Sequence, residues 1–270
     1  MIVNIGDIKI GKDQPMVLIS GPCAIENDDH PLFMAESISE ICNELNIPYI
    51  FKASWDKANR TALQNFRGVD IERAIKIFER IKKEVGCPIT TDIHESYQAD
   101  LLKGVVDLIQ IPAFLCRQTD LLLSAGNTGC GVNVKKAQFV EGDDMVKVVD
   151  KIKSTGNKNI LLTERGNTYG YGSYVVDFTN IIKMRKISPV IFDATHSVQQ
   201  GSKGGSSGSF REYIEPLARA GVAVGVDGLF MEVHDRPEEA LSDGTSSVRL
   251  SNLKNILTRL VKIGEIFNEN

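Results

Sequence analysis

Eight short apolar runs recur along the chain, each followed by polar residues and then by a stretch with helical spacing. The runs cover residues 16–20, 49–54, 88–92, 108–111, 131–134, 159–163, 190–194 and 228–232. Between and after them, apolar residues recur three and four positions apart, as on one face of a helix, at 31–45, 71–85, 144–155 and 250–267. Strands that are apolar throughout and alternate with helices predict a parallel sheet covered on both faces.

Eight strands are the number that closes a (β/α)8 barrel, so we predict an α/β protein with a TIM barrel. A doubly wound open sheet is the alternative that the same pattern allows. Residues 2–5 and 8–10 alternate apolar and polar around Gly6 and Asp7, which predicts a short antiparallel hairpin. We expect one domain over residues 1–270, in which 1–12 form the hairpin and 13–270 the barrel.

Composition and charge narrow the class of protein. The chain has 270 residues with a net charge of −4, which argues against a surface for nucleic acid or anionic membranes. No apolar run is long enough to span a membrane, and the first residues do not resemble a signal peptide, so we expect a soluble, cytoplasmic protein. The five cysteines show no CxxC pairing, which indicates reduced thiols rather than a disulfide framework.

Polar or reactive side chains follow every apolar run. In a TIM barrel the carboxyl ends of the strands form one rim, where the chemistry gathers. Any one of these residues could be an ordinary solvated loop residue, but solubility does not explain such a residue after every strand. In chain order they are Cys23, Lys52, Asp92 with His94, Gln110, Lys135, Arg165, His196 and Glu232.

Cations concentrate at this rim although the chain is acidic. Because like charges repel at short range, such a cluster predicts a polyanionic ligand carrying phosphate or carboxylate groups. A Schiff-base lysine is a further possibility, but the sequence singles out no one desolvated lysine. The cations are Lys52, Lys57, Arg60, Lys135 and Arg165.

A second set, Cys23, His196, Glu232 and Asp243, combines a thiol, an imidazole and two carboxylates. The first, seventh and eighth strands become neighbours when a barrel closes, and these donors suit a divalent metal. Three alternatives stay open at this stage. Cys23 could be a small core residue, it could pair with a histidine as a nucleophile, and His234 could be the histidine ligand instead of His196.

The glycine- and serine-rich stretch 201–209 could be a lid or an ordinary surface loop.

Several motifs together resemble one enzyme family, the 3-deoxy-D-manno-octulosonate 8-phosphate synthases, also called 2-dehydro-3-deoxyphosphooctonate aldolases. The resemblance implies a (β/α)8 barrel, usually a homotetramer, that condenses phosphoenolpyruvate with arabinose 5-phosphate in lipopolysaccharide biosynthesis. The motifs run nearly end to end: SGPCAIE (20–26), KASWDKANRTALQNFRG (52–68), IPAFLCRQTD (111–120), NVKKAQF (133–139), TERGNTYGY (163–171), FDATHSVQ (192–199), and LFMEVH with ALSDG within 229–244.

The resemblance assigns roles to residues of this chain. It implies that the phosphate and carboxylate of phosphoenolpyruvate are bound by Lys52, Lys57, Gln110, Lys135 and Arg165. It also implies that Asn59, Arg60 and Thr61 bind the sugar phosphate, and that Asp92 and His94 lie near the sugar and the reacting carbons. Arg117 resembles an arginine that reaches into a neighbouring subunit's site.

The family has a metal-free branch with asparagine at the position of Cys23 and a metal-dependent branch with cysteine. All four ligands of the second branch, Cys23, His196, Glu232 and Asp243, occur here. The resemblance therefore implies a divalent metal such as Zn, Fe, Mn or Co and no organic cofactor. We count Lys57, Asp92, His94, His196 and Asp243 as the candidate catalytic residues.

The chain departs from the family pattern at three places, namely Thr61 in place of serine, QGSKGG at 200–205 and GTSSVRL at 244–250. A rival interpretation is the related 3-deoxy-D-arabino-heptulosonate 7-phosphate synthase, which uses erythrose 4-phosphate and has a KPRT-type motif. This chain has KANRT, so Asn59 discriminates between the two. A non-catalytic sugar-phosphate-binding barrel would be expected to have lost metal ligands or cations, and none is missing.

Overall fold

The computed structural model describes residues 1–60, 62–169, 172–200 and 209–268. Within these ranges eight parallel strands form the central sheet, and all of their residues are buried. They are β3 (Val17–Gly21), β4 (Tyr49–Lys52), β5 (Ile89–Asp92), β6 (Leu108–Ile111), β7 (Gly131–Lys135), β8 (Ile160–Glu164), β11 (Val190–Asp193) and β12 (Gly228–His234). Burial on both faces is the reason that these strands read as unbroken apolar runs in the sequence.

The sheet closes on itself. Each strand pairs with the next one along the chain, β12 returns to β3 with Gly228 opposite Val17, and β11 also pairs with β12. The strands therefore form a closed parallel barrel, which confirms the predicted (β/α)8 fold. The open-sheet alternative is wrong, because an open sheet would leave the first and last strands unpaired.

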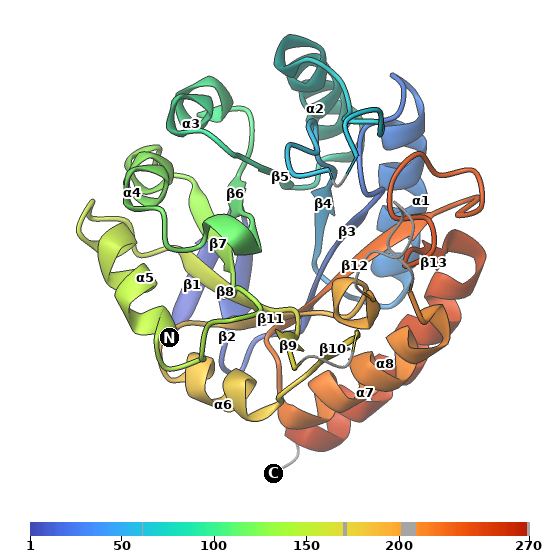
Figure 1. Cartoon of the computed structure of the whole chain (residues 1–270). Coiled ribbons are helices and arrows are strands. Elements are labelled where there is room, and N and C mark those ends of the chain that lie inside the picture. Colours follow the sequence, from blue (N-terminus) through green and yellow to red (C-terminus); the bar gives the residue numbers. More distant parts are fainter. Residues whose placement is uncertain (61, 170–171, 201–208, 269–270) are drawn as a thin grey trace.

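Helices surround the barrel (Figure 1). In the described part of the chain they are α1 (His30–Glu44), α2 (Ile71–Val85), α3 (Ser96–Leu102), α4 (Thr119–Asn127), α5 (Met145–Lys153), α6 (Thr179–Arg185), α7 (Ile214–Val224) and α8 (Leu250–Asn268). The amphipathic pattern explains how they pack: α2 buries Ala74, Ile77, Phe78 and Ile81, at helical spacing. Local sequence also determines where this helix begins and ends. At its start the Asp70 carboxylate accepts a hydrogen bond from the backbone N–H of Arg73, and at its end Gly86 adopts the left-handed conformation.

The predicted N-terminal hairpin is present and closes one end of the barrel. Strands β1 (Ile2–Ile5) and β2 (Ile8–Gly11) pair antiparallel around Gly6, whose φ of 53° suits a tight turn. Val3, Ile5 and Ile10 are fully buried in the same cluster as inward-facing residues of the barrel strands. In Figure 1 the hairpin lies behind the barrel strands.

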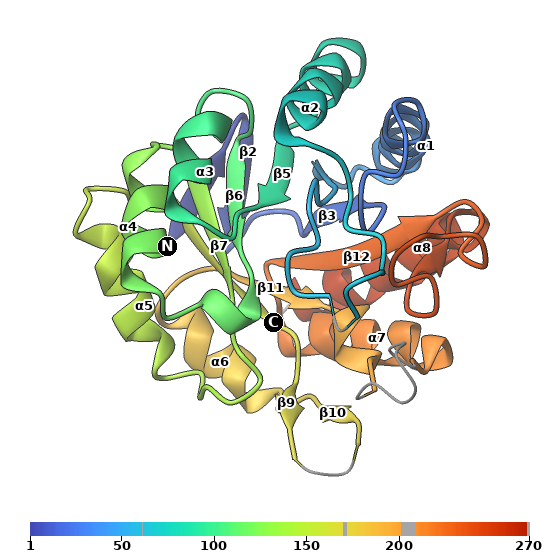
Figure 2. The same cartoon turned by 45° about the horizontal axis from the view of Figure 1, so that its top comes forward.

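Short elements complete the structure and lie mainly in the loops after the strands. They are the paired strands β9 (Asn167–Thr168) and β10 (Tyr174–Val175), β13 (Val248–Arg249) beside β12, and the 3₁₀ helices η1 (Ala113–Leu115), η2 (His196–Val198) and η3 (Arg211–Tyr213). Figure 2, turned by 45°, shows β9 and β10 projecting from the body of the barrel. No helix among the described residues is long and apolar enough to cross a membrane.

Candidate active site

Alternation along the strands places the polar residues of the site. Ile50, Leu108, Ile191 and Phe230 belong to the cluster inside the barrel. Because side chains alternate between the two faces of a strand, the residue two positions further also points inward, one layer nearer the carboxyl end. Those residues are Lys52, Gln110, Asp193 and Glu232, and all four are buried. The floor of the site is thus the top layer of the barrel interior.

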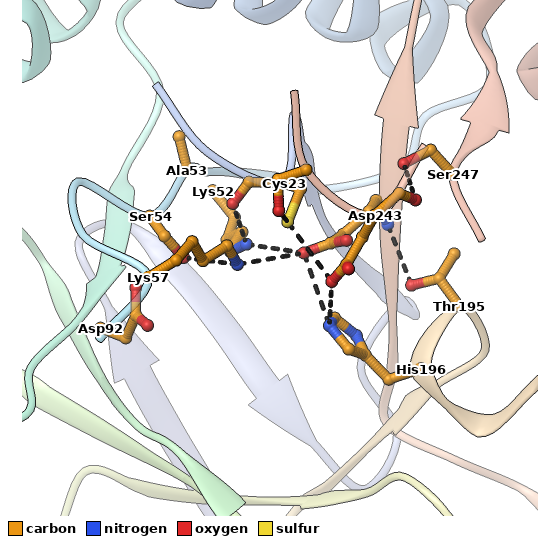
Figure 3. A network of polar contacts seen from close by, with 12 residues as sticks. Cys23, Lys52, Ala53, Ser54, Lys57, Asp92, Thr195, His196, Asp243 and Ser247 are labelled. Atoms are coloured by element: carbon orange, nitrogen blue, oxygen red, sulfur yellow. Dashed lines mark hydrogen bonds and ion pairs between the residues drawn. The ribbon is translucent and has the colours of Figure 1, made fainter. Parts of the chain in front are cut away.

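Cys23, Glu232 and Asp243 converge on one point beside this layer. A ligand atom from each lies within 4.8 Å of the others. The pairing of β3 with β12 sets Gly21 opposite Glu232, which brings Cys23 to the same place. From η2, the His196 Nε2 atom lies 3.6 Å from Glu232 Oε1 and 3.8 Å from Asp243 Oδ2. Figure 3 shows Cys23, Asp243 and His196 meeting in one network of contacts.

Two backbone features hold the ligands of this cluster. At Gly21 a Cβ atom would lie 2.0 Å from the carbonyl oxygen of Lys52, so only glycine lets the two strands approach here. Asp243 has a φ of 48°, a conformation in the left-handed region that aspartate tolerates better than most residues. The hydroxyls of Ser246 and Ser247 both donate to the Asp243 carbonyl oxygen, which fixes this turn.

Glu232 is the electrostatic centre of the network. Its Oε1 atom lies 2.9 Å from Lys52 Nζ and 3.9 Å from Lys57 Nζ. Burial by itself raises the pKa of the Glu232 carboxyl, but Lys52, His196 and Lys57 outweigh burial and hold that pKa well below its usual range. Lys52 also donates to the carbonyl oxygen of Cys23, 2.9 Å away, and so ties the first strand's loop to the cluster.

The cluster fits a divalent metal ion on chemical grounds. Thiolate, imidazole and carboxylate are the donors that zinc and related ions prefer in proteins. The Glu232 Oε2 atom is buried and has no hydrogen-bond partner among the described residues, which leaves an anionic oxygen available to a cation. Burial and the neighbouring Glu232 charge raise the pKa of the Cys23 thiol to about 12. A thiol of that pKa is a poor nucleophile, which argues against the Cys–His nucleophilic pair.

Asp193 is a residue of the site that sequence reasoning missed. Its Oδ2 atom lies 2.6 Å from Lys135 Nζ and 2.8 Å from His196 Nδ1, and its Oδ1 atom accepts the His196 backbone N–H. The Asp193 carboxyl is fully buried, and although burial raises its pKa, His196 and Lys135 bring the pKa well below the usual range. One carboxylate thus orients both a candidate metal ligand and a candidate phosphate-binding cation. Its inward position at the end of a strand was the available signal.

A cavity of about 510 Å³ opens above this layer. Most of the candidate residues from the sequence line it: Lys52, Lys57, Asn59, Arg60, Asp92, His94, Gln110, Lys135, Arg165, His196 and Asp243. Several buried polar atoms have no hydrogen-bond partner in the described part of the chain, among them Asp92 Oδ1, Gln110 Oε1 and Arg165 NH1. Unsatisfied buried polar groups in a cavity indicate a polar ligand that completes them.

The walls of the cavity orient its charged groups. His94 Nε2 lies 3.2 Å from Asp92 Oδ2. The Arg165 guanidinium donates to Gln199 Oε1 at 3.0 Å and lies over the Tyr174 ring, 4.5 Å from the ring centroid. Gln199 and Tyr174 are further lining residues that the sequence pattern gave no reason to select.

Lys135 is the cavity lysine whose pKa is lowered. Burial is the main cause, and it outweighs the raising effect of the Asp193 charge. The ammonium group also lies over the Phe230 ring, 3.7 Å from its centroid. The pKa of Lys57 is raised instead, because the Glu232 carboxylate and the charge that Cys23 takes on when it ionises at high pH together outweigh its burial.

Arg117 and His234 do not line this cavity, and two further positions that the sequence raised are not described by the structure. Arg117 is exposed and does not line the cavity of its own chain, and its carbonyl oxygen accepts a hydrogen bond from Lys151. Thr61 and residues 201–208 of the glycine-rich loop lie outside the described residues. His234 lies beside Glu26 and His30, so His196 is the histidine that joins the Cys23 cluster.

Comparisons with known proteins agree with this geometry. The sequence model of the DAHP synthetase I family matches residues 1–269. A 2-dehydro-3-deoxyphosphooctonate aldolase from Cyanothece sp. is 55% identical over 259 residues, which are 95% of either chain. The protein of that name from Rickettsia bellii is 52% identical over 270 residues, 99% of this chain and 98% of the relative. The protein of that name from Geobacter sulfurreducens is 51% identical over 266 residues, 98% of either chain. The chain therefore belongs to the DAHP synthetase I family and, within it, to the 2-dehydro-3-deoxyphosphooctonate aldolases, enzymes that form carbon–carbon bonds.

Proposed function

We propose that the protein condenses phosphoenolpyruvate with D-arabinose 5-phosphate and water to give 3-deoxy-D-manno-octulosonate 8-phosphate and phosphate, with a bound divalent metal. The names of the relatives support the product. The observation that carries the proposal is one cavity that holds several cations and the edge of a Cys–His–Glu–Asp cluster together. A pocket for a single anion would need neither the cluster nor so many cations.

The cations that line the cavity suit the charges of phosphoenolpyruvate. This substrate carries a phosphate and a carboxylate close together, and Lys57, Lys135 and Arg165 present charges toward one space. Arg165 can offer two parallel N–H donors to one anionic group, and one of its nitrogens, NH1, is buried without a partner among the described residues. Asn59 and Arg60, nearer the mouth, are left to bind the phosphorylated sugar.

In the reaction, C3 of phosphoenolpyruvate forms a bond to the aldehyde carbon of the sugar, and the aldehyde oxygen takes up a proton. Water adds at C2 and loses a proton, and the C2–O bond to phosphate breaks, which releases inorganic phosphate. Positive charge fixed in the cavity stabilises the negative charge that shifts between these oxygens. Asp92 and His94 form a pair that can hold and deliver a proton, because the pKa of His94 is raised.

Cys23, His196, Glu232 and Asp243 are the residues that would hold the metal ion. When bound, such an ion can orient and polarise an aldehyde oxygen as a Lewis acid. The Cys23 thiol must lose its proton to become a ligand, whereas the neighbouring Glu232 carboxyl, with its lowered pKa, is already anionic. Zn, Fe, Mn and Co all accept this mixed donor set, and metal availability selects among them.

Assembly and location are part of the same proposal. We propose a homotetramer in which Arg117 completes the cavity of a neighbouring subunit, since Arg117 is exposed and lies outside the cavity of its own chain. The phosphorylated substrates are cytoplasmic metabolites, so the cytoplasm is the expected compartment.

The deciding experiment is an assay of phosphate release from phosphoenolpyruvate with arabinose 5-phosphate or erythrose 4-phosphate, before and after chelation. We expect a higher kcat/KM with arabinose 5-phosphate, loss of phosphate release on chelation, and recovery when a divalent metal is added. A preference for erythrose 4-phosphate would support the heptulosonate synthase instead. Full activity in a metal-free sample would refute the metal requirement alone and leave the substrate assignment standing.

A further inference from the structure

A second group of ligating side chains lies beside the active site and is not used by the proposed reaction. It consists of Glu26, in the loop between β3 and α1, His30, the first residue of α1, and His234, the last residue of β12. One carboxylate oxygen and one ring nitrogen from each histidine lie within 4.8 Å of one another. The centroids of the two imidazole rings are 4.5 Å apart.

Both histidines have a buried ring nitrogen without a hydrogen-bond partner among the described residues. These atoms are His30 Nδ1 and His234 Nε2. His234 is only 4% exposed, and its Nε2 atom is 3.6 Å from Glu26 Oε2, too far for a hydrogen bond. A buried polar nitrogen without a partner is unfavourable by about 1–3 kcal/mol, so this pair of atoms needs an explanation.

Asp235 is placed to orient both rings. Its Oδ1 atom lies 2.9 Å from His30 Nε2 and 3.1 Å from His234 Nδ1. A histidine that ligates a metal with one nitrogen usually donates its other ring N–H to a carboxylate. If His30 Nε2–H donates to Asp235, the lone pair on His30 Nδ1 is free. If His234 Nε2 is a ligand, its ring proton sits on Nδ1, where Asp235 accepts it. The hydrogen bond that the Arg236 N–H now donates to that Nδ1 atom is then lost.

The charges of the group favour a cation. Glu26 and Asp235 bring two carboxylates to two imidazoles, and Arg236 offsets only part of this charge because it also pairs with Glu239. Two imidazoles and a carboxylate are a donor set for first-row divalent transition metals rather than for magnesium or calcium, which prefer all-oxygen sites.

We propose that Glu26, His30 and His234 form a second site for a divalent transition-metal ion, in which Asp235 orients the two imidazoles. The site links the loop after β3 to the end of β12. Glu26 also accepts the Leu241 N–H through its other oxygen, at 2.8 Å, and Leu241 lies in the segment that carries Asp243. The second ion therefore braces the two loops that supply Cys23 and Asp243.

Metal stoichiometry of the full chain tests the proposal. The chelator-treated protein is dialysed against Zn²⁺ alone, and bound zinc is measured per chain in a Cys23→Ala background, which weakens the first cluster by removing one of its four ligands. We expect one ion per chain at the second site, and a loss of at least tenfold in its affinity in His30→Ala and in Glu26→Gln. Glu26→Gln keeps an oxygen for the Leu241 N–H and so spares the loop. Asp28→Asn, an exposed carboxylate in the same loop, is the matched control and should bind zinc as its parent does.

Co²⁺ provides a second readout that does not depend on activity. Cobalt at the first cluster gives a thiolate charge-transfer band, whereas cobalt at the second site has only nitrogen and oxygen donors and gives ligand-field bands alone. We expect His30→Ala, in the chain that retains Cys23, to keep the thiolate band and lose the ligand-field component of the second site. Zinc binding that is the same in His30→Ala, Glu26→Gln and Asp28→Asn would overturn the proposal. Because the dialysis uses a Cys23→Ala background, its failure would leave the proposed function untouched.

Discussion

At the scale of single residues, Cys23 is the position that distinguishes the metal-dependent branch from the metal-free branch implied by the family resemblance. Its sulfur lies 2.8 Å from the Ser242 hydroxyl and 3.5 Å from Asp243 Oδ2, so the side chain sits within the donor cluster rather than in the apolar core. The family resemblance implies a related branch that has asparagine at this position and needs no metal. We therefore expect the residue at position 23 to influence the proposed metal dependence more directly than the other candidate ligands do.

We predict that Cys23→Asn weakens metal binding by at least about 100-fold, since loss of a residue that only hydrogen-bonds to a ligand already weakens binding by about 10- to 100-fold. The variant should keep part of its activity, because an asparagine side chain fits the same position in the metal-free branch. Metal titration of the chelated variant and steady-state rates of phosphate release measure the two effects. Cys42→Ala, at a buried cysteine of α1 far from the cluster, is the control. Complete loss of activity with an intact circular dichroism spectrum would show that Cys23 does more than hold metal.

A second residue-scale prediction concerns the charge on His94. Burial lowers the pKa of His94, but the hydrogen bond to Asp92 and the Asp92 charge outweigh it and raise that pKa above its usual value. The stability that the raised His94 pKa contributes is therefore complete below pH ~6.5, as long as Asp92 stays ionised, and is lost as the pH rises through the raised pKa of the folded state. In Asp92→Asn, burial dominates, so the His94 pKa should fall below that of the parent. Titration of the His94 ring resonances by NMR checks this, with Asp120→Asn at an exposed site as the control. An unchanged midpoint would contradict the assignment.

At the scale of elements, the strands could be predicted and the short helices only in part. Buried strands of a parallel barrel have no polar face, so each one is visible as an apolar run. The amphipathic pattern also indicated α1, α2, α5 and α8. The helices α3 and α6 have seven residues each, which is too few for a clear period, and such helices depend on packing for stability.

The site could be predicted where its residues end strands. Lys52, Gln110 and Glu232 point inward because of alternation along a strand, and polar residues at such positions are conspicuous. Asp193 obeys the same rule but was missed, because its contacts with His196 and Lys135 become visible only in the folded structure. The approach of Asp243 to Cys23 depends on the path of a long loop and on a left-handed turn. Those features have no periodic signature, so the donor type of Asp243 and the family resemblance were the grounds for grouping it with Cys23.

The N-terminal hairpin should contribute measurably to stability. Ile5 is buried inside the end of the barrel, and a Cβ added at Gly131 would lie 2.1 Å from its Cδ1 atom, so the packing there is tight. We predict that Ile5→Ala lowers the free energy of unfolding by about 2–5 kcal/mol. Ile2→Ala, in the same strand but at a side chain that is 50% exposed, should change it by less than about 0.5 kcal/mol. Urea denaturation of both variants compares them, and equal effects would mean that the hairpin is not packed into the barrel in solution.

At the scale of the whole molecule, the proposed metal cluster joins distant parts of the chain. Its ligands come from the loop after β3, from η2, from β12 and from the loop after β12. A ligand that binds only the folded state stabilises it, by about 2.7 kcal/mol at 100 times Kd. We predict that a divalent metal at that excess raises the Tm of the chelated protein by roughly 5 °C. Calorimetry of the parent and of His196→Ala provides the comparison, and an equal shift in both would exclude this cluster as the source.

The closure of the barrel also has a consequence for how the protein is made. Cys23 and Asp243 touch although 220 positions separate them in the chain. During synthesis the first of these residues leaves the ribosome long before the second, and the cluster can assemble only when β12 has docked against β3. A polypeptide released early carries most of the cavity cations yet lacks part of the proposed metal cluster. If the cluster binds metal as proposed, we expect retained metal to report full-length, correctly closed molecules in a preparation.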